Sequence, residues 1–127
     1  MQSIQKILVI DSDSISFIII KHIFSNTGIL PVFAHTKNAE DALSYLNKNE
    51  IPDLIFLEPV LPDMMDGEIF EALHTLNIFE KTLVCILTTY LEHELETLGG
   101  DYRILNKFSK PFKERHVAAL LNNLKAA

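Results

Sequence analysis

The stretch PDLIFLEPVLPDMMDG, from Pro52 to Gly67, decides the fold. After Pro52 and Asp53 it continues with a short apolar run, residues 54–57, then passes through the acid Glu58 and closes on glycine after a proline-containing loop. A continuous apolar run of this length is typical of a strand that is buried on both faces of a parallel sheet. An acid directly after such a strand stands at the carboxyl edge of the sheet.

Four other segments resemble this strand, and we predict that all five form one parallel sheet. The predicted strands are residues 6–11 (KILVID), 30–35 (LPVFAH), 53–58 (DLIFLE), 82–88 (TLVCILT) and 103–109 (RILNKFS), the last with the weakest pattern. Helical periodicity separates them, with predicted helices near residues 14–26, 39–46, 69–76, 91–98 and 117–124. Strands that alternate with helices imply right-handed crossovers and a doubly wound α/β fold.

Two helices carry further signals. Ile15 belongs to a broad apolar half of the first helix, whereas Ile18 falls among polar residues on the other half. The second helix is expected to begin at an Asn38 cap, with Asp41 three residues further on.

The composition limits the classes of function. The chain has 127 residues, enough for one domain, which we predict to span residues 1–127. Its formal net charge of −6 argues against direct binding to nucleic acid. The apolar runs are too short to cross a bilayer and the first residues lack a signal-peptide pattern, so we expect a cytoplasmic protein without membrane association. Cys85, the only cysteine, lies in an apolar strand and is predicted to be an unreactive core residue.

Polar residues follow the predicted strands where ligands of such sheets bind. They are Asp11, followed by Ser12 and Asp13, then Glu58, Thr88 and Lys110. Each alone is often an ordinary solvated residue, but together they bring acids, a hydroxyl and an ammonium to one edge. Clustered carboxylates with open positions suit Mg²⁺, and a lysine and a threonine suit the oxygens of a phosphoryl group.

Four motifs make the chain resemble the receiver domain of bacterial two-component response regulators over nearly its whole length. They are ILVIDSD (residues 7–13), the opening stretch (residues 52–67), ILTT (residues 86–89) and KPF (residues 110–112). The resemblance implies a flavodoxin-like fold with strand order 2-1-3-4-5. It also implies a signalling domain rather than an enzyme.

The resemblance assigns roles by position. Glu58 occupies the place of the phosphoacceptor aspartate, which takes a phosphoryl group from a phosphohistidine. Asp11, Glu58 and the backbone carbonyl of Val60 would hold Mg²⁺, and Thr88 and Lys110 would contact the phosphoryl oxygens. The Lys110–Pro111 peptide bond is expected to be cis. The implied partners are a sensor histidine kinase or phosphotransfer protein and a downstream signalling protein.

The chain departs from the family pattern at the acceptor and at the metal shell. Glu58 carries one more methylene than aspartate, which moves its carboxylate outward by roughly 1.5 Å. Such a carboxylate could pair with Lys110 and accept from Thr88, imitating a phosphorylated receiver. Ser12 replaces the second acid of the usual pair, so Mg²⁺ binding should be weak or absent unless Asp13 turns inward.

Two further departures concern the switch region. The loop from Pro62 to Gly67 is one residue longer than usual, and Lys107 stands where an aromatic residue is usual. Tyr90 or Phe108 are candidates to replace that aromatic residue.

Three readings of function are therefore open. We favour a pseudo-receiver that binds partners irrespective of phosphorylation. The first alternative is a working Mg²⁺-dependent phosphoacceptor. The second is a flavodoxin-like or nucleotide-binding enzyme, against which the loop DSDSIS (residues 11–16) argues because it has no glycine to approach a phosphate. The five histidines show no zinc-ligand spacing.

Overall fold

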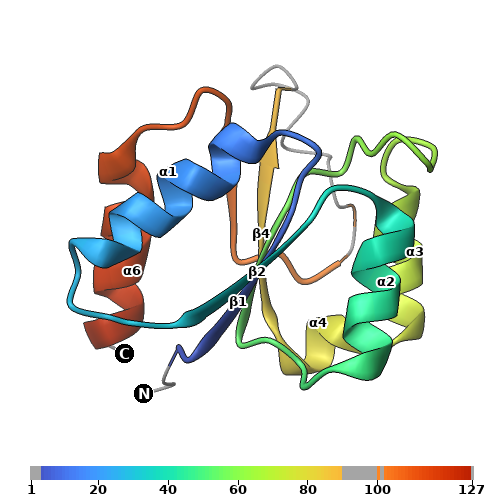
Figure 1. Ribbon diagram of the computed structural model, residues 1–127, viewed down its shortest axis with the longest axis horizontal. Coiled ribbons are helices and arrows are strands. Elements are labelled where there is room, and N and C mark those ends of the chain that lie inside the picture. The colour runs from blue at the N-terminus through green and yellow to red at the C-terminus, as the bar shows by residue number, and fades with distance from the viewer. Residues whose placement is uncertain (1–3, 90–99, 101, 127) are drawn as a thin grey trace.

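The computed structural model describes residues 4–89, 100 and 102–126, and these residues form a five-stranded parallel sheet between two layers of helices (Figure 1). The strand order is β2-β1-β3-β4-β5, which confirms the predicted flavodoxin-like α/β fold. The strands are β1 (Lys6–Ile10), β2 (Val32–Thr36), β3 (Leu54–Leu57), β4 (Leu83–Thr88) and β5 (Asn106–Ser109).

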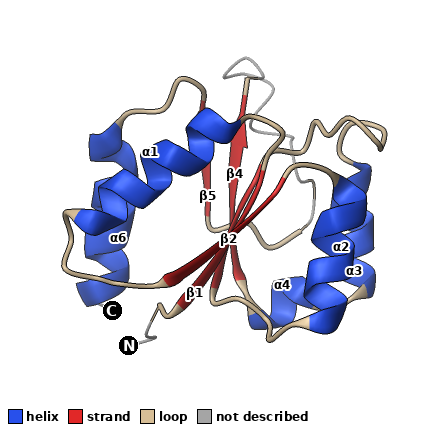
Figure 2. Ribbon diagram, in the orientation of Figure 1, coloured by secondary structure: helices blue, strands red, loops and turns tan. Residues whose placement is uncertain are grey.

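The described helices divide between the two faces of the sheet, as Figure 2 shows, with α1 and α6 on one side and the others on the opposite side. They are α1 (Ser14–Ser25), α2 (Ala39–Lys48), α3 (Glu68–Thr75), the short α4 (Ile78–Lys81) and α6 (Glu114–Ala126). None of the helices in the described part of the chain has the length and apolar character that a membrane span needs.

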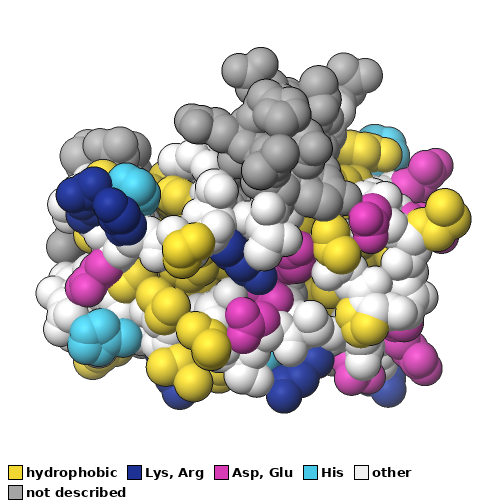
Figure 3. All heavy atoms as spheres, turned by 90° about the horizontal axis from the view of Figure 1, so that it is seen from above, with side chains coloured by type: hydrophobic (Ala, Val, Ile, Leu, Met, Phe, Trp, Pro, Cys, Tyr) yellow, Lys and Arg dark blue, Asp and Glu magenta, His cyan; other side chains and the backbone are white. Residues whose placement is uncertain are grey.

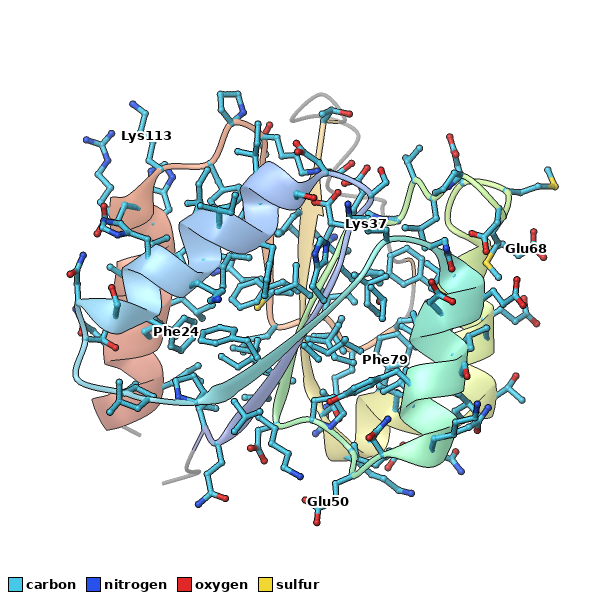
Figure 4. The ribbon with its side chains drawn as sticks, in the orientation of Figure 1. Phe24, Lys37, Glu50, Glu68, Phe79 and Lys113 are labelled. Atoms are coloured by element: carbon cyan, nitrogen blue, oxygen red, sulfur yellow. The ribbon has the colours of Figure 1, made fainter. Side chains whose placement is uncertain are left out.

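Each face of the sheet has its own hydrophobic core. Alternate side chains of a strand point to opposite faces, so that Leu8 and Ile10 pack toward α2 and α3 while Ile7 and Val9 pack toward α1 and α6. Phe24 on α1 and Phe79 on α4 point toward the sheet from opposite sides (Figure 4). Because both faces are covered, the central strands carry apolar residues on both faces, as the sequence predicts.

Phe56 and Cys85 lie side by side in the core beneath α1 and α6. They are register partners on β3 and β4, and neither is exposed to solvent. Burial raises the pKa of the Cys85 thiol to about 12, so the prediction of an unreactive core cysteine agrees with its surroundings.

The edge strands differ in extent from the prediction. Strand β2 begins at Val32, two residues later than predicted. Leu30 lies before the paired residues, and its side chain is 89% exposed. Strand β5 begins at Asn106, three residues later than predicted. Helix α4 was not predicted, because four residues are too few to show a helical period. The predicted helix at residues 91–98 lies outside the described residues.

Ile15 lies on the apolar half of α1, but not all of that half faces the sheet. Its side chain is 62% exposed, as is that of Ile18, whereas Ser16 is buried. The helix buries a narrower arc than its apolar half, centred on Ile20 and Phe24, because only that arc faces the sheet. Helix α1 therefore carries two exposed isoleucines one turn apart.

The cap predicted for α2 is confirmed. The backbone N–H of Asp41 donates to Asn38 Oδ1 at 2.7 Å, as expected for an N-cap asparagine.

Candidate functional site at the carboxyl edge of the sheet

The carboxyl ends of β1, β3, β4 and β5 bring four of the predicted site residues together. Asp11 follows β1, Glu58 follows β3, Thr88 ends β4, and Lys110 follows β5. Asp11, Glu58 and Thr88 are all buried, although the first two are acids. Seen from above, this face shows acidic side chains gathered near its middle beside a basic one (Figure 3).

Lys110 lies between the two acids. Its ammonium Nζ is 2.6 Å from Asp11 Oδ2 and 3.8 Å from Glu58 Oε2, so its close partner is Asp11 rather than Glu58. The Lys110 side chain is only 13% exposed. Its backbone N–H donates to the carbonyl of Thr88 at 2.7 Å, and the Lys110–Pro111 peptide bond is cis.

Glu58 is a buried acid whose charge is not fully compensated. Thr88 Oγ1 donates to Glu58 Oε1 at 3.4 Å, a long hydrogen bond, while Oε2 has no hydrogen-bond partner within the part of the chain that the structure describes. Burial raises the pKa of Glu58 from 4.5 to about 7. The charge of Asp11 raises this pKa too, whereas Lys110 and the hydrogen bonds from Thr88 and the Val60 backbone lower it.

Asp13, the candidate replacement metal ligand, is occupied elsewhere. It is exposed, and its Oδ1 accepts the backbone N–H of Ile15 at 2.9 Å, which makes it the N-cap of α1. The sequence held a signal for this role, because an aspartate just before the first residue of a helix is a preferred cap. Ser12 is exposed as well.

The predicted Mg²⁺ has few ligands in this arrangement. No group of three or more His, Cys, Asp or Glu that could hold a metal occurs among residues 4–89, 100 and 102–126. Asp11 and Glu58 are the two buried carboxylates, and Asp11 already contacts an ammonium. Mg²⁺ prefers near-octahedral oxygen ligands, so this donor set does not fit the ion well.

The loop that follows Glu58 is tied to α2 by a contact that sequence reasoning missed. The carboxylate of Asp63 accepts the backbone N–H groups of Ala39 and Glu40, at 2.8 and 2.9 Å. Together with Asn38 it thereby satisfies donors of the first turn of α2 that have no partner within the helix. These two hydrogen bonds lower the pKa of Asp63.

Removal of this carboxylate is expected to loosen both the loop and the start of α2. In Asp63→Ala, the amides of Ala39 and Glu40 should exchange hydrogen several-fold faster, because their acceptor is lost. Amide exchange read by NMR measures this directly. Met65→Ala, in the same loop and 77% exposed in the native protein, is the control and should leave the two amides unchanged. Equal exchange in both variants would contradict the role of Asp63.

Of the two residues proposed for the missing aromatic group, Phe108 belongs to the described part of the chain. Phe108 is 6% exposed and packs in the core with α6, so it does not replace a surface aromatic residue. Lys107 is half-buried on β5. Tyr90 lies outside the described residues.

Comparison with known proteins defines the class. The family model for the response regulator receiver domain matches residues 7–122. The chain therefore belongs to the response regulator receiver domain family, whose members act in two-component signalling. Receiver domains generally bind Mg²⁺ and interact with histidine kinases or phosphotransfer proteins.

Solved receiver domains share the fold. The receiver domain of the Francisella response regulator 1452 is 25% identical, with a TM-score of 0.76 over 94% of this chain and 95% of that one. The chemotaxis response regulator CheY4 of Vibrio cholerae is 20% identical, with a TM-score of 0.78 over 95% and 98%. A CheY-like receiver domain protein from Methanospirillum hungatei JF-1 is 22% identical, with a TM-score of 0.76 over 95% and 93%. No curated protein matches the chain.

Proposed function

We propose that this receiver domain is a pseudo-receiver, which signals through protein–protein contacts with Glu58 in place of a phosphorylated aspartate. The observation that carries the proposal is the burial of Glu58 at the acceptor position, with the Thr88 hydroxyl on one carboxylate oxygen and the Lys110 ammonium on the side of the other. A threonine and a lysine are the groups that contact the phosphoryl oxygens in the family.

The side-chain length of Glu58 supports this reading. Its carboxylate extends roughly 1.5 Å beyond that of an aspartate, so its negative charge lies nearer to the place of a phosphoryl group. A nucleophile displaced by this distance also loses its attack geometry toward a phosphodonor. The pKa of about 7 means that the charged, phosphate-like form of Glu58 gains population as the pH rises through neutrality.

The proposed partners are a sensor histidine kinase or phosphotransfer protein and a downstream signalling protein in the cytoplasm. Ile15 and Ile18 offer such a partner an exposed apolar surface on α1, next to the site edge. Figure 3 shows hydrophobic side chains gathered over the α1 side of this face. A working phosphoacceptor is the alternative that the following experiment separates.

The native protein is expected to remain unphosphorylated. It is incubated with Mg²⁺ and acetyl phosphate beside Glu58→Asp and the double variant Ser12→Asp/Glu58→Asp, and the intact mass of each is measured. Only the double variant, which restores both acids of the family pattern, should gain the mass of a phosphoryl group. Glu71→Asp, the same change at an exposed position on α3, is the matched control and should stay unmodified.

Two other outcomes are informative. Phosphoryl gain on Glu58 of the native protein would refute the proposed function and favour the working phosphoacceptor. Gain by Glu58→Asp alone would leave the proposed function standing, because glutamate alone would then have silenced the acceptor.

A further inference from the structure

We infer that the ammonium of Lys110 is the built-in cation of this site and that the native protein takes up no Mg²⁺ there. This inference deepens the proposed function, since it states how a receiver site works without its usual ion. Its test measures metal binding rather than phosphoryl transfer, so that either proposal can fail without the other.

The burial of two acids creates the need for a cation. Asp11 is 0% exposed and Glu58 is 5% exposed, at the ends of the neighbouring strands β1 and β3. When both are ionised, two carboxylates brought together in a buried place repel each other, and a nearby cation offsets this repulsion. In the part of the chain that the structure describes, Lys110 forms an ion pair with each acid. Its Nζ lies 2.6 Å from Asp11 Oδ2 and 3.8 Å from Glu58 Oε2.

The backbone holds this cation in place. The N–H of Lys110 donates to the carbonyl of Thr88, which extends the pairing of β4 with β5 by one step. Phe112, two residues further on, is buried in the core beneath α6. The backbone of Lys110 is thus anchored on both sides, and its side chain, 13% exposed, brings the ammonium to 2.6 Å from Asp11 Oδ2.

Few oxygen atoms of the site remain as ligands for Mg²⁺. Asp11 Oδ2 contacts the ammonium, Glu58 Oε1 accepts from Thr88, and Asp13 caps α1. Ser12 contributes no charge. A dication placed beside Asp11 would meet the positive charge of Lys110 at close range, which lowers its affinity further.

Removal of the ammonium is therefore expected to create a Mg²⁺ requirement. Thermal unfolding is measured above neutral pH in EDTA and in millimolar MgCl₂, with the native protein, Lys110→Met and the control Lys113→Met, whose lysine is exposed. The melting temperature of the native protein and of the control should rise by less than about 1 °C on addition of Mg²⁺. That of Lys110→Met should rise by about 3–6 °C, because the ion now neutralises the two acids. Calorimetric titration with MgCl₂ should show binding by Lys110→Met alone.

Each contrary result counts against the inference. A rise of several degrees in the native protein would overturn it, whatever the variants do. A Lys110→Met variant that folds and binds no Mg²⁺ would overturn it as well. If this variant unfolds in EDTA, recovery of its fold in MgCl₂ supports the inference, and failure to recover is checked with Lys110→Gln, whose amide can still donate to Asp11. Absence of Mg²⁺ binding in that variant too would overturn the inference.

Discussion

Replacement of Glu58 by glutamine is expected to raise the free energy of unfolding above neutral pH by about 3 kcal/mol and to change it little in acid. The pKa of Glu58 is about 7 in the folded protein and 4.5 when the group is unperturbed, so the folded state binds the proton more tightly. The stabilisation from this proton is complete below pH 4.5 and is lost as the pH rises through 7. Glutamine has no such proton to lose.

Urea unfolding in EDTA, at a series of pH values from below 4.5 to above 7, measures this difference. The gap between glutamine and glutamate should be small below pH 4.5, widen between pH 4.5 and about 7, and then stay level. Glu71→Gln, at an exposed position on α3, is the matched control. A constant gap for Glu58→Gln would mean that Glu58 is not held in an environment that disfavours its charge.

Truncation of Phe56 to alanine is expected to cost about 3–5 kcal/mol of stability. Its ring is fully buried on the central strand β3, within the core under α1 and α6, where the surrounding strands cannot close the space that the ring leaves. A loss of this size is a large share of the total stability of a small domain. Urea unfolding of the purified variant measures it.

Leu30→Ala is the control for this truncation. Leu30 is 89% exposed, so its removal should change the free energy of unfolding by less than about 0.5 kcal/mol. Similar losses in both variants would contradict the assignment of Phe56 to the core.

The central part of the fold was predictable because it depends on local patterns. Strands β1, β3 and β4 are apolar on both faces, and this pattern appears directly in the sequence. The edges were harder to predict. Leu30 is as apolar as a core residue, although the following Pro31, which has no N–H to give to a ladder, is a local sign that the strand starts later. The exposure of Ile15 depends on which arc of α1 faces the sheet, and this arc is set by packing rather than by the helix itself.

The membership of the candidate site was predictable, but its internal pairing was not. The ends of parallel strands meet at one edge, so Asp11, Glu58, Thr88 and Lys110 could be brought together from the sequence alone. That Lys110 approaches Asp11 more closely than Glu58 depends on side-chain positions within a few ångströms. The contact of Asp63 with the start of α2 joins segments more than twenty residues apart, for which the sequence carries no local signal.

Because Cys85 is buried, its reaction with a thiol reagent can report how often the native fold opens. Cys85 is the only thiol, it lies on β4 with no exposure to solvent, and its raised pKa keeps it in the unreactive protonated form. An alkylating reagent can therefore reach it only when the sheet separates from α1 and α6. The rate of alkylation, followed by mass, gives the frequency of that opening without an introduced label, and it allows the variants described above to be ranked in dilute solution and without denaturant.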